Sequence, residues 1–196
     1  MVMKNADITG IILAGGRSSR MGTDKAFIKI GNKTLIENAI DLIKDFCSEI
    51  LISTNIHTGN SFPERRLIPD ERKGLGPIGG IYSCLKHSGT EHNLVIAVDI
   101  PYINNGLIQF LLSNVADFEL VVPVTGKGKP EPLCAVYKKS VLPYLEKMIA
   151  ETDLKVQNLM NYCKTAKLNV SGEQKFYHDR LFHNVNTPDD SNLLTL

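Results

Sequence analysis

Cysteine is scarce in this sequence, and its four thiols lie far apart. Cys47, Cys84, Cys134 and Cys163 form no CxxC pair, and no histidine stands near them at the spacing of metal ligands. This pattern argues against structural zinc and against a disulfide framework. We therefore expect a protein of the reducing cytoplasm.

Long apolar runs are also missing. The amino-terminal segment MVMKNADITGIILAGG has one lysine, and glycines soon break its apolar run. Nowhere does the chain have the 18 or so consecutive apolar residues that a membrane-spanning helix requires. The sequence predicts neither a signal-peptide core nor a membrane span.

An excess of charge of one sign is absent as well. Lysine and arginine number 22, aspartate and glutamate number 21, and the formal net charge is +1. Such a balance provides no overall field for holding a nucleic-acid backbone or an anionic membrane, so we expect neither as a partner. An anionic substrate must instead meet local positive charge.

The composition is that of an ordinary globular protein. Of the 196 residues, 43% are hydrophobic and 22% charged, and the chain contains no repeat, low-complexity linker or shift in composition. These values exclude disorder, collagen and coiled coil, and they predict a single domain over residues 1–196.

Apolar runs of strand length alternate with longer stretches of helical period, which is typical of a mostly parallel sheet with helices on both faces. The predicted strands are Ile8–Leu13, Ile50–Ser53, Leu67–Ile68, Leu94–Val98, Leu120–Pro123, Leu133–Tyr137 and residues 165–170. The predicted helices cover residues 34–47, 77–88, 104–115, 140–150 and 155–161, with a short last helix from Thr187; Gly31, Pro77 and Asn104 precede or open the first three. We predict a Rossmann-like α/β fold of three layers, α/β/α, in which ligands bind beyond the carboxyl ends of the strands.

A glycine-rich, basic loop follows the first predicted strand. Its glycines let backbone N–H groups approach a ligand, and its cations add positive charge, a combination suited to a polyphosphate. The glycines are Gly15, Gly16 and Gly22, and the cations are Arg17, Arg20 and Lys25. Their spacing fits neither GxxxxGK[ST] nor GxGxxG. A flexible, solvent-exposed loop is the alternative interpretation.

Asp99 follows the predicted strand Leu94–Val98 and precedes Ile100 and Pro101. A carboxylate at the edge of a parallel sheet is well placed to hold Mg²⁺ against phosphate oxygens. An aspartate before such a turn is also a common way of entering a helix, so this residue alone leaves both interpretations open.

Two other segments follow predicted strands. Asp70 opens a glycine-rich run that enters a helix at Pro77, where backbone N–H groups and the helix dipole favour an anion; helix packing is the alternative. Near the carboxyl terminus, Asn184 and Asn186 stand two residues apart, and in a strand they would share one face. The Thr-Pro pair that follows them is a good helix start.

The segment IILAGGRSSRMGTDK resembles the signature of the molybdenum cofactor guanylyltransferases, within the nucleotidyltransferase superfamily. Relatives that build sugar nucleotides or cytidyl intermediates usually have proline before the motif lysine, where this chain has Asp24 before Lys25. Cytidylyltransferases of the cofactor usually have Ala-Ala-Gly where this chain has Ala14, Gly15 and Gly16, so the resemblance favours guanine. Matching segments run from residue 10 to residue 190, in the family's order.

The resemblance implies a fold like that of the nucleotide-diphospho-sugar transferases, with a nucleotide-binding half over residues 1–100 and a pterin-binding part over residues 101–196. The implied catalytic residues are Lys25, Arg20 and Asp99, with Asp99 as the Mg²⁺ ligand. The implied nucleotide-binding residues are Leu13, Ala14, Gly15, Gly16, Lys25, Ser53, Asn55, Asp70, Gly76, Gly80 and Asp99, where Ser53 and Asn55 compete for one position. Asn184, Asn186 and Pro132 are the implied contacts of the pterin substrate or of the metal's surroundings, and the segment from Lys129 to Leu133 resembles the one that faces the pterin in the family.

The implied reaction transfers GMP from GTP to the terminal phosphate of Mo-molybdopterin, with Mg²⁺ as cofactor and pyrophosphate as the second product. The sequence contains no obvious Ser/His/Asp or Cys/His set for a covalent intermediate. An acceptor phosphate is already an ionised nucleophile, so positioning and charge neutralisation suffice. We expect Arg20 to hold the departing phosphates and Lys25 to stabilise charge at the α-phosphate.

Other functions remain open at this point. A molybdopterin cytidylyltransferase or a sugar-nucleotide enzyme would share the fold and differ in substrates. A regulatory module that binds GTP without turning it over would keep the glycine loop, but it has less need of Asp99 and of the two asparagines. We expect a monomer that makes transient contacts with other proteins of cofactor biosynthesis.

Overall fold

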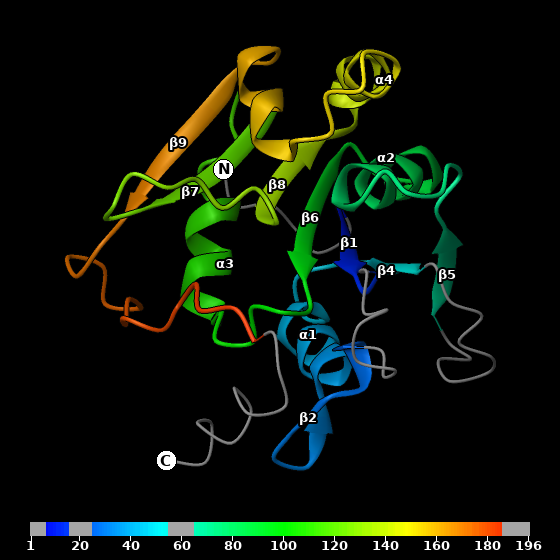
Figure 1. The fold of residues 1–196 in the computed structure, drawn as a ribbon. Helices are drawn as coiled ribbons and strands as arrows, with labels where there is room; N and C mark the ends of the chain where they lie inside the picture. The colour runs from blue at the N-terminus through cyan, green and yellow to red at the C-terminus, as the bar shows by residue number, and fades with distance from the viewer. Residues whose placement is uncertain (1–6, 16–24, 55–64, 186–196) are drawn as a thin grey trace.

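The computed structural model describes residues 7–15, 25–54 and 65–185, and it confirms the predicted fold class. Figure 1 shows a central sheet with helices on both faces. Its strands are β1 (Ile8–Leu13), β4 (Glu49–Thr54), β5 (Arg66–Pro69), β6 (His92–Ala97), β7 (Leu120–Thr125), β8 (Cys134–Lys138) and β9 (Thr165–Val170). Their order across the sheet is β5-β4-β1-β6-β8-β7-β9.

The sheet is mostly parallel. Strand β1 pairs in parallel with β4 and β6, and β4 pairs in parallel with β5. Strand β8 runs antiparallel to both of its neighbours, β6 and β7, while β9 is parallel to β7. Since β8 is reversed, its amino end lies at the edge of the sheet where β1 and β6 end.

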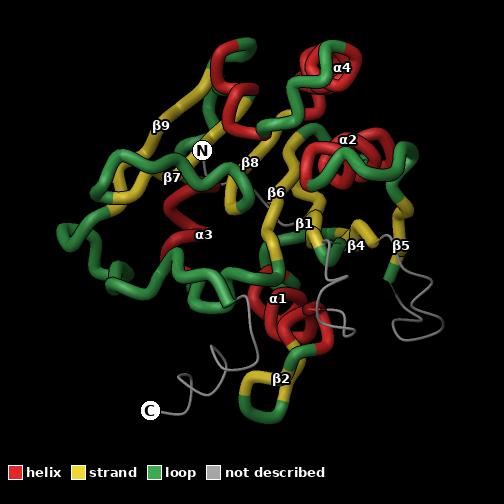
Figure 2. Tube along the Cα trace, viewed as in Figure 1, coloured by secondary structure: helices red, strands yellow, loops and turns green. Residues whose placement is uncertain are grey.

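The helices form the two outer layers. They are α1 (Leu35–Ile43), α2 (Pro77–His87), α3 (Asn105–Leu112) and α4 (Leu142–Ala150), with short 3-10 turns at Lys25–Phe27, Lys139–Val141 and Val156–Asn161. Helices α2 and α4 pack together on one face, and α1 and α3 pack together on the other (Figures 1 and 2). Within the described residues, no helix has the length and apolar character needed to cross a bilayer.

The core lies on both sides of the inner strands. Every residue of β1 is buried, and Ile11, Ile12 and Leu51 are at most 1% exposed. A strand covered on both faces reads as a continuous apolar run, which explains why β1 was predictable to the residue.

The first predicted helix differs from α1 at both ends. The hydroxyl of Thr34 accepts a hydrogen bond from the backbone of Glu37, and the Glu37 carboxylate accepts one from the backbone of Thr34, so Thr34 caps the helix, which begins one residue later than predicted. The helix ends at Ile43 instead of residue 47. Phe46 and Cys47 continue the apolar period and pack on the core from the following turn, which made the helix look longer in sequence.

Other predicted boundaries move for related reasons. Helix α3 ends at Leu112 instead of residue 115, and the Ser113 hydroxyl donates to the Gln109 carbonyl at 2.7 Å there. Strand β6 begins at His92 and ends at Ala97, where residues 94–98 were predicted, because the polar pair His92 and Asn93 takes part in the sheet. The predicted helix at 155–161 is a 3-10 helix. The predicted last helix lies outside the described residues.

A small hairpin, β2 (Lys29–Ile30) with β3 (Lys33–Thr34), precedes α1 and was not predicted. Its strands have two residues each, too few for a period of two to be recognised. The hairpin and the 3-10 turn before it bring the chain back from the glycine-rich loop to the start of α1.

Candidate active site

A cleft of about 780 Å³ runs along the edge of the sheet where the parallel strands end. Because β5, β4, β1, β6 and β8 are neighbours in that order, the cleft crosses the sheet from Asp70, after β5, to Leu133, before β8. Its described lining residues are Leu13, Ala14, Gly15, Lys25, Ser53, Asp70, Lys73, Gly74, Leu75, Gly76, Pro77, Gly80, Ala97, Val98, Asp99 and Leu133.

Most residues predicted to bind nucleotide meet in this cleft. They are Leu13, Ala14, Gly15, Lys25, Ser53, Asp70, Gly76, Gly80 and Asp99. The predicted residues Gly16, Arg20, Asn55 and Asn186 lie outside the described part of the chain. Pro132 and Asn184 are described but do not line the cleft.

The end of β1 is held between its two neighbours. The Ala14 N–H donates to the Ser53 carbonyl at 3.0 Å, and the Val98 N–H donates to the Leu13 carbonyl at 3.3 Å. These bonds continue the parallel pairing one residue past the strands. The backbone of Ala14 and Gly15 is thereby placed at the centre of the cleft, where the predicted phosphate loop begins.

The described chain resumes at Lys25, which also lines the cleft. It begins the 3-10 turn Lys25–Phe27, and the next residue, Ala26, is buried and anchors that turn. Lys25 interacts electrostatically with Asp99, and its positive charge acts to lower the pKa of that carboxyl. The cleft therefore brings together a cation and a carboxylate that lie 74 positions apart in the sequence.

Asp99 is a partly buried carboxyl directly beyond the edge of the sheet. Burial raises its pKa above the ordinary value of 3.8, and this effect outweighs the opposing charge of Lys25 and a backbone hydrogen bond. Because burial disfavours the charged form of this carboxyl, a cation that approaches it stabilises the carboxylate. Its backbone carbonyl accepts a hydrogen bond from the Val185 N–H at 2.8 Å, which brings the carboxyl-terminal segment beside it.

In the described part of the chain, Asp99 is the carboxylate that could hold Mg²⁺ at this point of the cleft. Among the described residues, no group of three His, Cys, Asp or Glu side chains is arranged to hold a metal ion. Mg²⁺ commonly uses one or two carboxylates and takes its other ligands from phosphates and water. Asp99 in a cleft suited to phosphates fits that mode of binding.

Ser53, Asp70 and Gly80 form the far end of the cleft. The Ser53 hydroxyl donates to Asp70 Oδ1 at 3.2 Å and so orients the carboxylate. Gly80 leaves room for this bond, because a Cβ added there would lie 2.4 Å from Ser53 Oγ. The packing role that the sequence allowed for Gly80 is therefore also a role in shaping the site.

The loop from Asp70 to α2 closes this end. The Glu71 N–H donates to the Ser83 hydroxyl at 3.0 Å, and the Glu71 carboxylate pairs with Lys86 at 2.8 Å, so the loop is tied to α2. Gly76 precedes the helix with φ +68°, a conformation that favours glycine. Pro77 then places the amino end of α2, with its positive dipole, at the cleft.

Of the two carboxyl-terminal asparagines, Asn184 is exposed and lies outside any strand. Asn186 lies outside the described residues, so the shared face expected for the pair stays a prediction. The carboxyl-terminal segment also packs against Tyr102, three residues beyond Asp99. His178 Nε2 lies 3.2 Å from the Tyr102 carbonyl, and the Tyr102 ring meets the His183 ring edge to face.

One part of the cleft was missed in the sequence, and another was placed there only by the resemblance. Leu133 belongs to the segment that resembles the pterin-facing one; it was placed inside a predicted strand, but it precedes β8 and lines the cleft because that strand is antiparallel. Lys73, in the loop that begins at Asp70, was given no role from the sequence, and it adds a cation at the Asp70 end of the cleft. A lysine in a glycine-rich loop next to a predicted site was the signal available for it.

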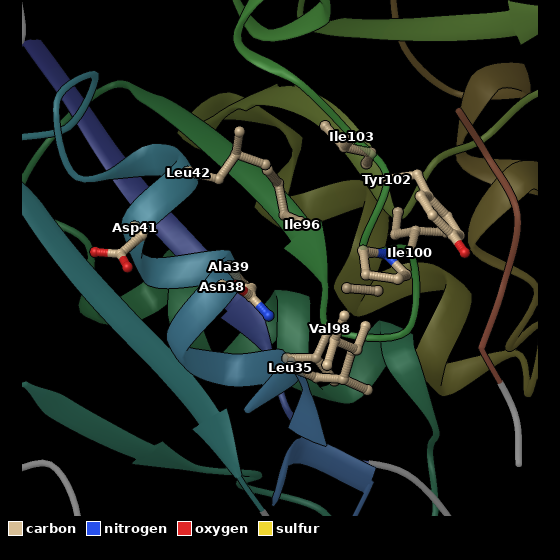
Figure 3. A pocket seen from close by; sticks show the side chains of 13 residues that line it. Leu35, Asn38, Ala39, Asp41, Leu42, Ile96, Val98, Ile100, Tyr102 and Ile103 are labelled. Carbon is tan, nitrogen blue, oxygen red and sulfur yellow. The ribbon is translucent and has the colours of Figure 1, made fainter. Parts of the chain in front are cut away.

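A second cavity, of about 400 Å³, lies between α1 and the segment that follows β6. Ala97 and Val98 line both cavities. Figure 3 shows its apolar side chains, among them Leu42, Val98 and Ile100, with the Asp41 carboxylate set apart from them. Among the described residues that line this cavity, Asp41 is the only charged one, and it pairs with Lys33 and Lys44.

Fold and cleft together are those of the nucleotidyltransferase class of enzymes. Gly15, Lys25 and Asp99 meet where the strands of an α/β sheet end. The family model described as the MobA-like NTP transferase domain matches residues 10–166. The chain belongs to this family.

Similar proteins extend over nearly the whole chain. A probable molybdenum cofactor guanylyltransferase of Flavobacterium johnsoniae is 32% identical over 96% of this chain and 97% of its own length. One of Clostridium perfringens is 34% identical over 97% and 95%. Among solved structures, molybdopterin-guanine dinucleotide biosynthesis protein A of Archaeoglobus fulgidus matches with a TM-score of 0.78 and 26% identity over 95% of this chain and 96% of that one.

Proposed function

We propose that this chain transfers GMP from GTP to the terminal phosphate of Mo-molybdopterin, forming molybdopterin guanine dinucleotide and pyrophosphate. The observation that carries the proposal is the arrangement of the cleft. Lys25 and Asp99 lie at its centre, between the oriented carboxylate of Asp70 at one end and Leu133 at the other. Membership of the family and the names of the relatives support the same reaction.

The Asp70 end suits guanine. Guanine presents two adjacent donors, N1–H and the 2-amino group, and a carboxylate accepts from both at once. Cytosine presents an acceptor next to a donor on the corresponding edge, which a carboxylate matches less well. We place the base against Asp70 and the loop that ends at Gly76, with Ser53 holding the carboxylate in position.

The chemistry is a direct displacement. An oxygen of the acceptor's terminal phosphate forms a bond to the α-phosphorus of GTP, and the bond from that phosphorus to the oxygen bridging to the β-phosphate breaks. The electron pair of the broken bond leaves with pyrophosphate. Lys25 stabilises the negative charge that develops around the α-phosphate, and the backbone N–H groups beyond β1 orient the triphosphate.

We assign Mg²⁺ to Asp99. When bound, the ion would neutralise phosphate charge and favour departure of pyrophosphate. Asp99 supplies the protein ligand, and phosphate oxygens and water would complete the coordination. The raised pKa of this buried carboxyl supports the assignment, because a bound cation offsets the cost of its charge.

The same proposal implies a cellular compartment and partner proteins for the enzyme. The thiols of Cys47, Cys84, Cys134 and Cys163 are free, which fits a reducing compartment, and we place the enzyme in the cytoplasm. We infer a monomer that passes its product directly to other proteins of cofactor biosynthesis.

Nucleotide choice tests this function. Purified protein is given Mg²⁺, Mo-molybdopterin and one of GTP, CTP, ATP or UTP, and pyrophosphate release is followed with and without the acceptor. We expect pyrophosphate release with GTP, and we expect it to depend on the acceptor. The rate with GTP should exceed the rate with CTP by at least about tenfold, which corresponds to the contribution of one good hydrogen bond. Faster release with CTP would identify a cytidylyltransferase, and GTP binding without release would favour the regulatory module.

A further inference from the structure

Leu133 forms the wall of the cleft farthest from the Asp70 end. Its carbonyl accepts a hydrogen bond from the Ala97 N–H at 2.9 Å, which joins the segment before β8 to the end of β6. Asp99 lies two residues beyond Ala97. Any shift of the Leu133 backbone therefore changes the shape of the cleft on the far side of the reacting centre.

The segment from Lys129 to Leu133 has few backbone donors of its own. Pro132 carries no N–H, so the sheet cannot hold it by the usual ladder. Before it, Pro130 is bridged to Val124, and the Glu131 N–H donates to the Pro123 carbonyl at 3.0 Å. The Cys134 N–H donates to the Glu131 carbonyl at 3.0 Å and closes a turn over Pro132 and Leu133. Inside this turn, the position of the Pro132–Leu133 peptide also depends on what the Pro132 carbonyl meets.

The carbonyl of Pro132 meets a tyrosine. Tyr137, on β8, donates from its hydroxyl to this carbonyl at 2.6 Å. The side chain is fully buried, at 0% exposed, in the apolar core beneath the segment. A phenol buried among apolar side chains needs an acceptor, and burial raises its pKa, so it remains a donor at neutral pH.

We propose that Tyr137 is a positioning residue for the acceptor: its buried hydroxyl holds the Pro132–Leu133 peptide as the wall against which the pterin substrate lies. This inference rests on the proposed function and deepens it. Tyr137 acts through the peptide, since its burial keeps it from touching a substrate.

The order of the strands says which substrate is affected. The nucleotide end is built by residues after β5, β4 and β1, while Leu133 is contributed by β8, on the other side of β6. Loss of the Tyr137 bond disturbs the β8 side and leaves the bond from Ser53 to Asp70 intact. The affinity for the acceptor falls and the affinity for GTP does not.

The test is Tyr137→Phe, which removes the hydroxyl and keeps the ring in the core. We expect the KM for Mo-molybdopterin to rise about three- to tenfold, as for the loss of one neutral hydrogen bond, and the KM for GTP to stay within about twofold. Hydrogen exchange should accelerate in peptides covering residues 129–136 and not in peptides covering residues 66–83.

The matched control is Tyr82→Phe. It removes a tyrosine hydroxyl that donates to Glu146 at 2.9 Å between α2 and α4, away from Leu133. We expect neither KM to change in this variant. Equal rises in both KM values of Tyr137→Phe, or a lower melting temperature with both unchanged, would overturn the positioning role.

The exchange measurement separates this inference from the proposed function. If the unaltered protein transfers no nucleotide, the proposed function fails, and faster exchange confined to residues 129–136 still supports the role of Tyr137 in holding the wall. Unchanged exchange in that segment overturns the inference whatever the activity.

Discussion

Asp99 is subject to two opposing requirements on its charge. Its negative charge is needed for a cation, yet its surroundings disfavour that charge, as its raised pKa records. The positive charge of Lys25 partly offsets the effect of burial on the Asp99 carboxyl, and Lys25 itself lines the cleft. Groups whose ionisation is disfavoured until a ligand arrives are common at functional sites.

Asp99→Asn tests this residue. Without Mg²⁺ at pH 7 we expect the variant to melt at a higher temperature than the parent protein, because the buried charge is gone. We expect its activity to need at least about tenfold more Mg²⁺, since loss of the ligand itself should cost no less than loss of a residue that only orients a ligand. Asp117→Asn, an exposed change of the same kind, is the control; a magnesium titration like that of the parent protein would reject Asp99 as the ligand.

At the scale of the element, the first turns of α2 shape the nucleotide end. Gly80 lies one turn into the helix, and its lack of a side chain lets β4 come close enough for Ser53 to reach Asp70. The glycine is unfavourable for the helix itself, by about 1 kcal/mol relative to alanine. Gly80 thus makes α2 less stable but allows the geometry of the site.

Gly80→Ala should therefore affect binding more than folding. The new Cβ would displace the Ser53 hydroxyl, and we expect the KM for GTP to rise about three- to tenfold with a small change in melting temperature. Gly89→Ala, at an exposed glycine with no heavy atom within 4 Å of the added Cβ, is the control. An unchanged KM for GTP in Gly80→Ala would contradict the role of the Ser53–Asp70 bond.

Elements were predictable where burial alone decides the pattern. Strand β1 is buried on both faces and was predicted to the residue, whereas β6 begins with the polar residues His92 and Asn93. Asn93 is buried because its side chain donates to the Glu91 carbonyl at 3.1 Å, a contact that the sequence does not reveal. Helix ends were missed where Phe46 and Cys47 pack from a turn.

For the whole molecule, the site was predictable as far as parallel strands build it. The residues that follow β5 and β6 share one edge of the sheet with the ends of β1 and β4, so Asp70 and Asp99 were expected together. Leu13 and Ser53, which lie at the ends of β1 and β4, were expected there from the resemblance. The place of Leu133 at this edge came only from the resemblance, because nothing in an apolar run states which way its strand points. Strand direction depends on pairing across the sheet, which is a property of the entire fold.

The most direct test follows the labelled phosphorus of GTP. Protein with Mg²⁺ and Mo-molybdopterin is given GTP labelled at the α- or the γ-phosphate, alongside the variants Lys25→Ala and Lys29→Ala. We expect the label of the α-phosphate in a product joined to molybdopterin and the label of the γ-phosphate in pyrophosphate. Lys25→Ala should be slower by two to three orders of magnitude, about 3–4 kcal/mol as for a lost oxyanion donor, and Lys29→Ala should be unaffected. Release of γ-label as inorganic phosphate, with no α-label on molybdopterin, would contradict it.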